Sequence, residues 1–470
     1  MPIQFHLNGE LRVEDSLPPT TSVLDYLREH RGQTGTKEGC AEGDCGACSI
    51  VLIRKGEGGK SVYEAVNSCL LMLLQLDGAN VVTVEGVAGA NALDPVQTAM
   101  VETGGTQCGF CSPGFIMALY ALRHGDEEPT DDVIHDALAG NLCRCTGYTP
   151  IVNAARDACS GDAEDVYGGL DAPVATPSYS AGDQQFFAPT NLSELAELRA
   201  AHPDAYMLTG GTDLGILTSK ERMPLLEIIH TSKVAELLGI EETDDYLELG
   251  AAVTYTRALP YIERLYPSFA TLITRIGSRQ IRNVGTIGGN IGNASPIGDT
   301  PPCLIALDAT LILHSAEGVR ELPIEEFFLD YRKTDLKPGE FIKGVRIPKL
   351  SGNQEFRAYK ISKRYDQDIS AVVGAYRLDV SGGSVADVRV AFGGMAATPK
   401  RSPASEAALL GKDWSEENAL AAAPAITEDF SPISDHRASE AYRLRVAENL
   451  FVRLYRDLSG DGELIEVVTA

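Results

Sequence analysis

Apolar and polar residues alternate at the start of the chain, which predicts a β-hairpin. Every second residue of 3–7 is apolar, and the side chains of a strand point to alternate faces of the sheet. The turn signal Asn8-Gly9 follows, and residues 11–13 continue the alternation on a return strand. Thr21 is the predicted cap of a short helix. Ahead of a glycine-rich cysteine loop, these elements predict a β-grasp, ferredoxin-like domain over residues 1–85.

Helical periodicity and helix-start signals dominate the next stretch. Helices are predicted over residues 115–122, 133–138 and 149–158. Ser112-Pro113 is typical of an N-cap followed by the first helical residue, and Thr149-Pro150 resembles it. Asp131-Asp132 begins the middle helix and Gly140 ends it. The pattern predicts an all-α domain over residues 86–160.

The second half of the chain mixes both periodicities. Residues 161–182 are polar and hold few large apolar side chains, which indicates a linker. An α+β domain is predicted over residues 183–352. A C-terminal α+β domain follows over 353–470, with strands at 371–380 and 385–392 on either side of Ser-Gly-Gly-Ser and an amphipathic helix over 438–458. The fold class predicted is therefore a multidomain α+β protein.

Length and charge limit the choice of partners. A chain of 470 residues is too long for one core, and about three or four domains are expected. The 40 Lys and Arg against 66 Asp and Glu give a net charge of −26, which disfavours nucleic acid and anionic membranes. The start lacks the pattern of a signal peptide, and the longest apolar run, at 69–74, is too short to span a membrane. We therefore expect a cytoplasmic protein.

Eight of the ten cysteines form two groups with metal-ligand spacing. The first group is Cys40, Cys45, Cys48 and Cys69. Its spacing, C-x4-C-x2-C and a distant fourth cysteine, is that of plant-type [2Fe–2S] proteins. Gly39, Gly43 and Gly46 leave room for backbone amides to wrap around sulfur and iron. A structural zinc site or buried thiols are the alternatives, but zinc sites more often pair two C-x2-C knuckles.

The second group lies at helix ends and has a less specific spacing. It consists of Cys108, Cys111, Cys143 and Cys145. A C-x2-C followed by a C-x-C suits either an iron–sulfur cluster or zinc, and spacing alone leaves both open. The remaining Cys159 and Cys303 are expected to be small buried hydrophobic residues.

Two glycine-rich turns, at 209–213 and 285–293, are candidates for binding a pyrophosphate through backbone amides. Ordinary strand-to-loop turns are the alternative, and neither turn is a G-x-G-x-x-G that opens a helix, so a Rossmann site is not supported. Lys360, Lys363 and Arg364 form a small basic cluster in an acidic chain, for which a solvated loop is the simpler interpretation.

The two cysteine groups, AGNLCRCTGY, TGGTDLG and GTIGGNIGNASPIGDTPP occur in this order. Together they closely resemble the iron–sulfur and flavin subunits of the molybdenum hydroxylase family, and among these the bacterial xanthine dehydrogenases, over essentially the whole chain. Two cluster domains ahead of a flavin domain is the order in xanthine dehydrogenases, whereas relatives such as carbon monoxide dehydrogenase carry these parts on separate chains.

The resemblance implies that the second cysteine group also binds a [2Fe–2S] cluster and that residues 183–352 bind FAD. The implied FAD contacts are Met207, Leu208, Thr209, Gly210, Gly211, Thr212, Asp213, Leu214, Thr286, Asp299, Ile342 and Lys360. Residues 361–369 match the family loop near the flavin that helps to decide NAD⁺ access. Two departures stand out: Ile276 replaces an aromatic residue of animal members, and Asp213 is the acidic residue of a turn that usually bears asparagine and glutamate.

The resemblance also implies a function. The chain would be the electron-transfer subunit of a xanthine dehydrogenase, which passes electrons from a molybdenum cofactor on a molybdopterin-binding large subunit through two [2Fe–2S] clusters to FAD and then to NAD⁺, while hypoxanthine and xanthine are oxidised to urate. No residue of this chain would be catalytic on the purine. A heterotetramer with two copies of each chain is expected. The alternatives are the same subunit of an aldehyde or N-heterocycle dehydrogenase, or a stand-alone iron–sulfur flavoprotein.

Overall fold

The computed structural model describes residues 1–89, 92–161 and 163–460. One residue of the predicted linker, 162, and the last ten of the predicted C-terminal domain lie outside the described residues. The chain divides into two compact units. The first is Met1–Val234 with Gly277–Gly285, and the second is Ala235–Ile276 with Thr286–Ala470. Each unit is described by itself.

The first unit begins with the predicted hairpin in a five-stranded sheet. The strands are β1 (Ile3–Leu7), β2 (Glu10–Glu14), β3 (Ser49–Lys55), β4 (Ser61–Asn67) and β5 (Asn80–Val82), in the order β2-β1-β5-β3-β4. Asn8 and Gly9 at the turn both have positive φ, at 53° and 84°, as tight hairpins require. β1 runs parallel to β5, and its apolar face is buried. The predicted β-grasp fold is confirmed.

The helix after the hairpin has a different cap from the one predicted. In α1 (Val23–Asp25) the hydroxyl of Ser22 accepts a hydrogen bond from the amide of Asp25 at 3.0 Å. The hydroxyl of Thr21 instead donates to the carbonyl oxygen of Pro18. The prediction of Thr21 as the cap was wrong by one residue, because two adjacent hydroxyl residues offer the same local signal.

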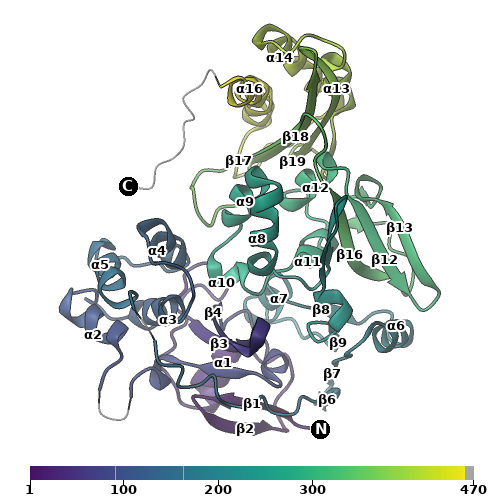
Figure 1. Cartoon of the computed structure of the whole chain (residues 1–470). Helices are drawn as coiled ribbons and strands as arrows, with labels where there is room; N and C mark the ends of the chain where they lie inside the picture. The colour runs from purple at the N-terminus through teal and green to yellow at the C-terminus, as the bar shows by residue number, and fades with distance from the viewer. Residues whose placement is uncertain (90–91, 162, 461–470) are drawn as a thin grey trace. The chain divides into compact units, whose positions relative to one another are not determined.

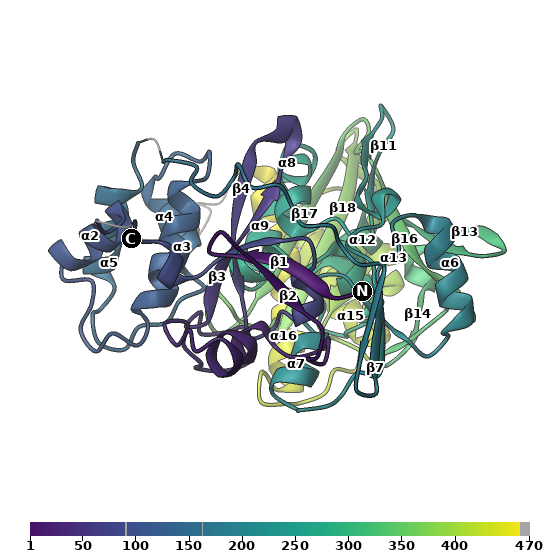
Figure 2. The ribbon, with the colours of Figure 1, turned by 90° about the horizontal axis from the view of Figure 1, so that it is seen from below.

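Four helices form the second domain of this unit: α2 (Pro95–Glu102), α3 (Ser112–Arg123), α4 (Asp131–Leu138) and α5 (Thr149–Ala158). They lie together beside β3 and β4 (Figures 1 and 2). Sequence reasoning missed α2, although Asp94 and Gln97 form a capping box around Pro95. It also placed the N-cap of α3 at Ser112, whereas Cys111 occupies that position.

The predicted linker 161–182 makes specific contacts and ends in a strand. The hydroxyl of Tyr167 donates to the carbonyl of Gly86 at 2.6 Å, and Asp165 accepts from Tyr63. The strands β6 (Ser178–Ala181), β7 (Gln184–Phe187), β8 (Tyr206–Leu208) and β9 (Glu227–His230) form a sheet in the order β6-β7-β9-β8. The helices of this part are α6 (Leu192–Ala201), α7 (Leu214–Ser219) and α10 (Arg279–Arg282).

The second unit contains two larger sheets. The first is β10 (Ile240–Glu242), β11 (Tyr246–Gly250), β16 (Phe341–Pro348), β12 (Thr310–Ser315) and β13 (Gly318–Pro323), in that order. The helices that accompany it are α8 (Tyr255–Leu265), α9 (Pro267–Thr274), α11 (Ile287–Gly292) and α12 (Thr300–Ala306), and β14 (Phe328–Asp330) pairs with β15 (Lys333–Thr334). The main apolar core of the unit lies between these helices and the sheets.

The other sheet belongs to the C-terminal part. Its strands are β17 (Gln354–Ile361), β18 (Val372–Ser381), β19 (Ser384–Gly393) and β20 (Lys400–Arg401). The helices are α13 (Pro403–Leu409), α14 (Glu416–Ala422), α15 (Ile426–Asp429) and α16 (Glu440–Ser459). The predicted β18–β19 hairpin and the amphipathic helix are present within about two residues of the predicted bounds.

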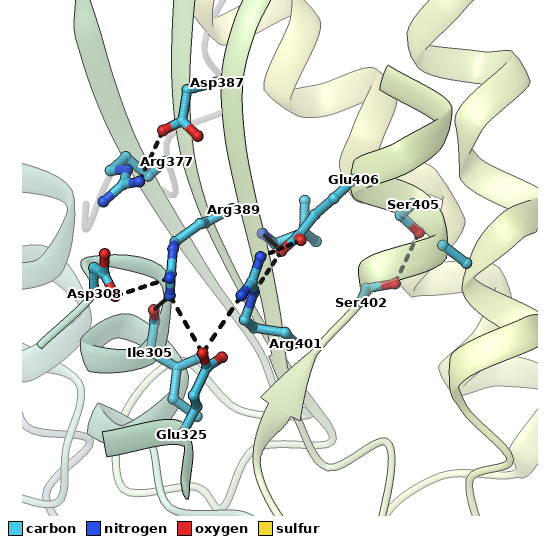
Figure 3. Close-up of polar contacts among 12 residues, drawn as sticks. Ile305, Asp308, Glu325, Arg377, Asp387, Arg389, Arg401, Ser402, Ser405 and Glu406 are labelled. Atoms are coloured by element: carbon cyan, nitrogen blue, oxygen red, sulfur yellow. Dashed lines mark hydrogen bonds and ion pairs between the residues drawn. The ribbon is translucent and has the colours of Figure 1, made fainter. Parts of the chain in front are cut away.

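An arginine-rich network joins α12 and its following loop to β18–β20 (Figure 3). Arg377 and Arg389 face each other on adjacent strands, where like charges repel. Each has its own carboxylate: Arg377 bonds Asp387 at 2.8 Å, and Arg389 bonds Asp308 at 2.9 Å. Because each guanidinium charge is neutralised by a carboxylate, Arg377 and Arg389 can both lie in the largely buried contact between α12 and the sheet.

We expect Glu406→Gln to destabilise the second unit. Glu406 is 8 % exposed and accepts from the amide of Val390 at 2.9 Å and from Arg401. Loss of a charge-assisted bond of this kind costs about 1.5–3 kcal/mol, so the thermal unfolding midpoint should fall. Glu417→Gln, on the exposed side of α14, is the control, and equal midpoints for the two variants would contradict the expectation.

Candidate functional site

The four thiols of the first cysteine group lie in two pairs. The thiol of Cys48 lies 3.3 Å from that of Cys69, and both residues are buried. The thiols of Cys40 and Cys45 form the other pair, joined by a hydrogen bond from Cys45. That bond is the main cause that lowers the pKa of Cys40, to about 5, and it raises the pKa of Cys45. One sulfur of the pair thus carries negative charge readily.

Backbone amides surround the sulfur of Cys40. The amides of Glu42, Asp44 and Cys45 donate to this sulfur at 3.4, 3.3 and 3.3 Å. The loop achieves this by left-handed turns at Ala41, with φ 55°, and at Gly43, with φ 80°. Amides that point inward stabilise a thiolate without any cationic side chain.

The second cysteine group also forms two pairs. Cys108 and Cys145 are exposed, with their sulfur atoms 3.3 Å apart. Cys111 and Cys143 form the other pair. Burial raises the pKa of Cys111 most, and the hydrogen bond that Cys111 donates to Cys143 raises it further, to about 12. The Thr146 hydroxyl donates to the sulfur of Cys143 at 3.0 Å and helps to lower its pKa to about 7, against the effect of burial.

The two-plus-two arrangement of the thiols bears on the choice between zinc and iron. A structural zinc ion is bound by four ligands around one metal position. A [2Fe–2S] cluster holds four thiolates on two irons, and two separated pairs suit that donor set. Both cysteine groups therefore fit [2Fe–2S] clusters.

The two remaining cysteines are core residues, as predicted. Cys159 is 5 % exposed and Cys303 is 0 % exposed, and each packs within an apolar cluster. Burial raises the pKa of both thiols, that of Cys159 to about 12. Neither contributes to a metal site.

The first predicted FAD turn joins β8 to α7 in the first unit. Its backbone approaches neighbouring chain closely: a Cβ on Gly210 would lie 1.9 Å from the carbonyl oxygen of Val284. Gln75 donates to the carbonyls of Thr209 and Gly210 at 3.2 Å each, which fixes the turn. Thr212 and Leu214 are partly exposed and Asp213 is exposed, whereas Leu208 is buried in the core, so only its backbone is left to meet a ligand.

This turn rests directly on the first cysteine loop. A Cβ on Gly215, in α7, would lie 2.2 Å from the carbonyl oxygen of Leu70, the neighbour of Cys69. Ser219 at the end of α7 donates to the carbonyl of Ala41 at 2.7 Å. The helix that follows the predicted pyrophosphate turn therefore packs directly against residues next to Cys69 and Cys40 within the first unit.

The other predicted FAD residues belong to the second unit. The ammonium group of Lys360 donates to Asp299 at 2.6 Å, and the hydroxyl of Ser370 donates to the other carboxylate oxygen at 2.6 Å. Thr286 caps α11 by accepting from the amide of Gly289. Ile342 is partly buried in β16. The structure thus brings Asp299 and Lys360 together in a buried ion pair.

Sequence reasoning missed the residues that hold the loop after Lys360. Arg275 donates to the carbonyl of Lys360 at 2.9 Å and to the hydroxyl of Ser362 at 3.1 Å, and its guanidinium lies 4.6 Å from the ring centre of Tyr365. Nothing local in the sequence marks a long-range contact of this kind. Ile276, the departure from an aromatic residue, packs against the apolar core.

The predicted basic cluster does not act as one group. Lys360 is 7 % exposed and paired with Asp299, whereas Lys363 and Arg364 are exposed. The interpretation as a solvated loop therefore holds for the last two residues and is wrong for Lys360.

Four family models match the chain. They are the 2Fe-2S iron-sulfur cluster binding domain over residues 5–72, the [2Fe-2S] binding domain over 83–156, the FAD binding domain in molybdopterin dehydrogenase over 181–350, and the CO dehydrogenase flavoprotein C-terminal domain over 357–458. The chain belongs to the molybdenum hydroxylases, with the domain architecture of their iron–sulfur and FAD subunit.

Curated relatives include several xanthine dehydrogenases. Those of Emericella nidulans and Arabidopsis thaliana (xanthine dehydrogenase 1) are each 32% identical, over 97% and 88% of this chain. The chain spans 38% and 36% of their lengths. The alignments thus run through both cluster domains and the flavin domains in one order.

Solved relatives match more than half of the chain. Carbon monoxide dehydrogenase from Hydrogenophaga pseudoflava is 29% identical with a TM-score of 0.55, and it covers 58% of this chain and 96% of its own. Quinoline 2-oxidoreductase from Pseudomonas putida 86 is 28% identical with a TM-score of 0.54, and it covers 59% and 96%. None of the described helices of this chain is long and apolar enough to cross a membrane.

We expect Cys143→Ser to remove the second cluster and leave the first intact. The reason is that each cysteine group is complete within its own domain. Iron should fall from about four to about two atoms per chain, because each cluster holds two irons, and flavin content should stay unchanged. Cys159→Ser is the control, since that thiol lies outside both groups. Full iron content in Cys143→Ser would show that Cys143 is not a ligand.

Proposed function

We propose that this chain is the cytoplasmic electron-transfer subunit of a xanthine dehydrogenase, which serves the oxidation of hypoxanthine and xanthine to urate at a molybdenum cofactor on a molybdopterin-binding large subunit, with NAD⁺ as acceptor. The observation that supports it most is the alignment with xanthine dehydrogenases over 97% of the chain, through all four domains. The matched chains of the carbon monoxide and quinoline enzymes cover 58% and 59% of this chain.

The redox groups define what the residues have to do. When bound, the two clusters supply one-electron chemistry and FAD supplies the exchange between one-electron and two-electron steps. The amides around Cys40 hold thiolate charge, and the turn at Gly210 and Gly211 offers its backbone to a pyrophosphate. Asp299 accepts from the ammonium group of Lys360 and is itself held by the hydroxyl of Ser370. No residue needs to act as an acid or base on the purine.

The surroundings of the second cysteine group favour a partner at that site. Cys108 and Cys145 are exposed, and so are the apolar residues Phe110, Leu142 and Tyr148, at 50 %, 46 % and 39 %. Apolar side chains that surround an exposed redox site are typical of a docking face. We place the molybdenum-bearing subunit on this face, in a heterotetramer with two copies of each chain.

The cysteines are consistent with a reducing compartment. Eight of the ten cysteines fall into two groups with metal-ligand spacing, and disulfides are rare in the cytosol. This observation supports the proposed cytoplasmic location.

A second candidate function is the same role for an aldehyde or N-heterocycle substrate. The likeness to quinoline 2-oxidoreductase favours this candidate. Since the proposed substrate pocket lies on the partner, the residues of this chain do not choose between the two substrates. Substrate turnover by the reconstituted complex distinguishes the two candidates.

We expect Asp299→Ala to reduce FAD retention. The change leaves the ammonium group of Lys360, whose side chain is 2 % exposed, without its counter-charge. Breaking a buried pair in this way costs about 3–5 kcal/mol, which should disorder the loop that follows Lys360. Flavin content after gel filtration measures the effect, with the exposed Asp244→Ala as control. Equal content in both variants would remove Asp299 from the site.

We expect the chain alone to show no xanthine-dependent NADH formation and the chain co-expressed with a molybdopterin-binding partner to show it. The reason is that the four matched family models describe [2Fe-2S] and flavoprotein domains, and the proposal assigns the molybdenum cofactor to the partner. Molybdenum content is measured alongside activity. Xanthine oxidation by the solitary, molybdenum-free chain would contradict the proposal, and turnover of quinoline-like substrates alone would favour the second candidate.

A further inference from the structure

A short segment belongs to a different compact unit from its neighbours in the sequence. Residues Gly277–Gly285 group with the cluster domains of the first unit, whereas the chain on both sides of them groups with the second unit. We call this segment the strap. The strap contains α10 and contacts both cluster domains. It can therefore hold the two cysteine groups in position relative to each other.

The strap is fixed to the helical cluster domain by charge. Arg279 and Arg282 both bond the carboxylate of Asp136 in α4. Burial pushes the pKa of Asp136 upward, but the two guanidinium groups hold it below its ordinary value. Arg282 itself is only 4 % exposed. Two guanidinium groups on the two oxygens of one carboxylate fix its orientation as well as its position.

The strap is fixed to the ferredoxin-like domain by a hydrogen bond and by apolar packing. The side-chain amide of Asn283 donates to the carbonyl of Ala65 in β4 at 2.9 Å. Ile281 packs against Leu70 and against the cysteine loop, where a Cβ on Gly43 would lie 3.1 Å from its Cδ1. Both cluster domains are therefore attached to the same nine-residue segment.

Between these attachments a buried chain of hydrogen bonds connects the two cysteine groups. Gln280 donates to the side-chain oxygen of Asn141 at 2.8 Å, and the amide of Asn141 donates to the carbonyl of Gly46 at 3.0 Å. The backbone amide of Leu142 donates to the carbonyl of Cys45 at 3.0 Å. Leu142 directly precedes Cys143. One backbone hydrogen bond therefore joins Cys45 of the first group to the residue next to Cys143 of the second group.

The junction has no spare room. A Cβ on Gly140 would lie 2.0 Å from the side-chain oxygen of Gln280, and one on Gly46 would lie 2.2 Å from the carbonyl of Gly140. Gln280 is 0 % and Asn141 2 % exposed. A polar group buried so tightly adds little stability over an apolar one, but it permits only the arrangement that satisfies its bonds.

We propose that Gln280 of the strap and Asn141 are positioning residues for electron transfer between the two cluster sites. By holding the amide of Leu142 on the carbonyl of Cys45, they set the separation and electronic coupling of the two cysteine groups. The transfer moves one electron from the reduced to the oxidised cluster and changes no covalent bond. This role depends on the two cluster domains and is independent of which substrate or acceptor the enzyme uses.

The test compares Asn141→Ala, Asn141→Asp and Gln280→Ala in the full chain with both clusters and FAD bound. Asn141→Asp keeps the shape but replaces the donor to Gly46 by an acceptor. The measured quantities are the magnetic interaction between the two reduced clusters in EPR spectra, the rate of electron exchange between them after pulse radiolysis, the two reduction potentials and the iron content. We expect weaker interaction and exchange slowed on the order of tenfold or more, with iron retained.

Arg156→Gln, which removes an exposed ion pair with Asp131 on the same domain, is the control and should leave exchange unchanged. Gln280→Ala acts from outside the cysteine loops, so it tests the proposal even if a variant of Asn141 loses iron. Wild-type exchange and wild-type magnetic interaction in Asn141→Asp or in Gln280→Ala, with both clusters bound, would overturn the proposal, because a packing role alone predicts that the isosteric variant behaves as the wild type.

Discussion

The hydrogen bonds from backbone amides to the sulfur of Cys40 are the interaction on which the rest of the first unit depends. To aim three amides at one atom, the loop has to pass through left-handed conformations at Ala41 and Gly43 and, further on, at Gly46. Glycine is the residue that adopts these conformations without strain. The same glycines have no side chain, so neighbouring backbone can approach the loop. The chemistry of one sulfur thus determines how the surrounding chain packs.

The consequences extend to both sides of the loop. On one side Gly215 and Ser219 bring α7, and with it the predicted pyrophosphate turn, onto the residues next to Cys69 and Cys40. On the other side Asn141 and the strap bring the second cysteine group onto Gly46. A single unit therefore holds two cluster sites and eight of the twelve predicted FAD contacts, while the ion pair of Lys360 and Asp299 belongs to the second unit.

Local sequence patterns predicted the features that neighbouring residues determine, such as turns, helix starts and the cysteine loop. The alternation before Asn8-Gly9 and the proline-marked starts of α3 and α5 gave elements close to those observed. The cysteine spacing predicted the first metal site, because a loop of that length can wrap one cluster. Thr21 was misplaced as a cap because the adjacent Ser22 offers the same local signal, whereas the N-cap of α3 is Cys111, which makes no side-chain cap bond. The bonding of Arg275 and the strap could not be predicted, because both join residues far apart in the sequence.

The central claim is that the chain holds two different [2Fe–2S] clusters, one in a glycine-rich loop and one at helix ends. A potentiometric titration of the purified chain followed by EPR tests it most directly, with iron, sulfide and zinc measured on the same sample. The account predicts two distinct signals that appear at separate potentials, with about four irons and four sulfides per chain. A single signal with half that iron, or zinc in stoichiometric amount, would contradict it.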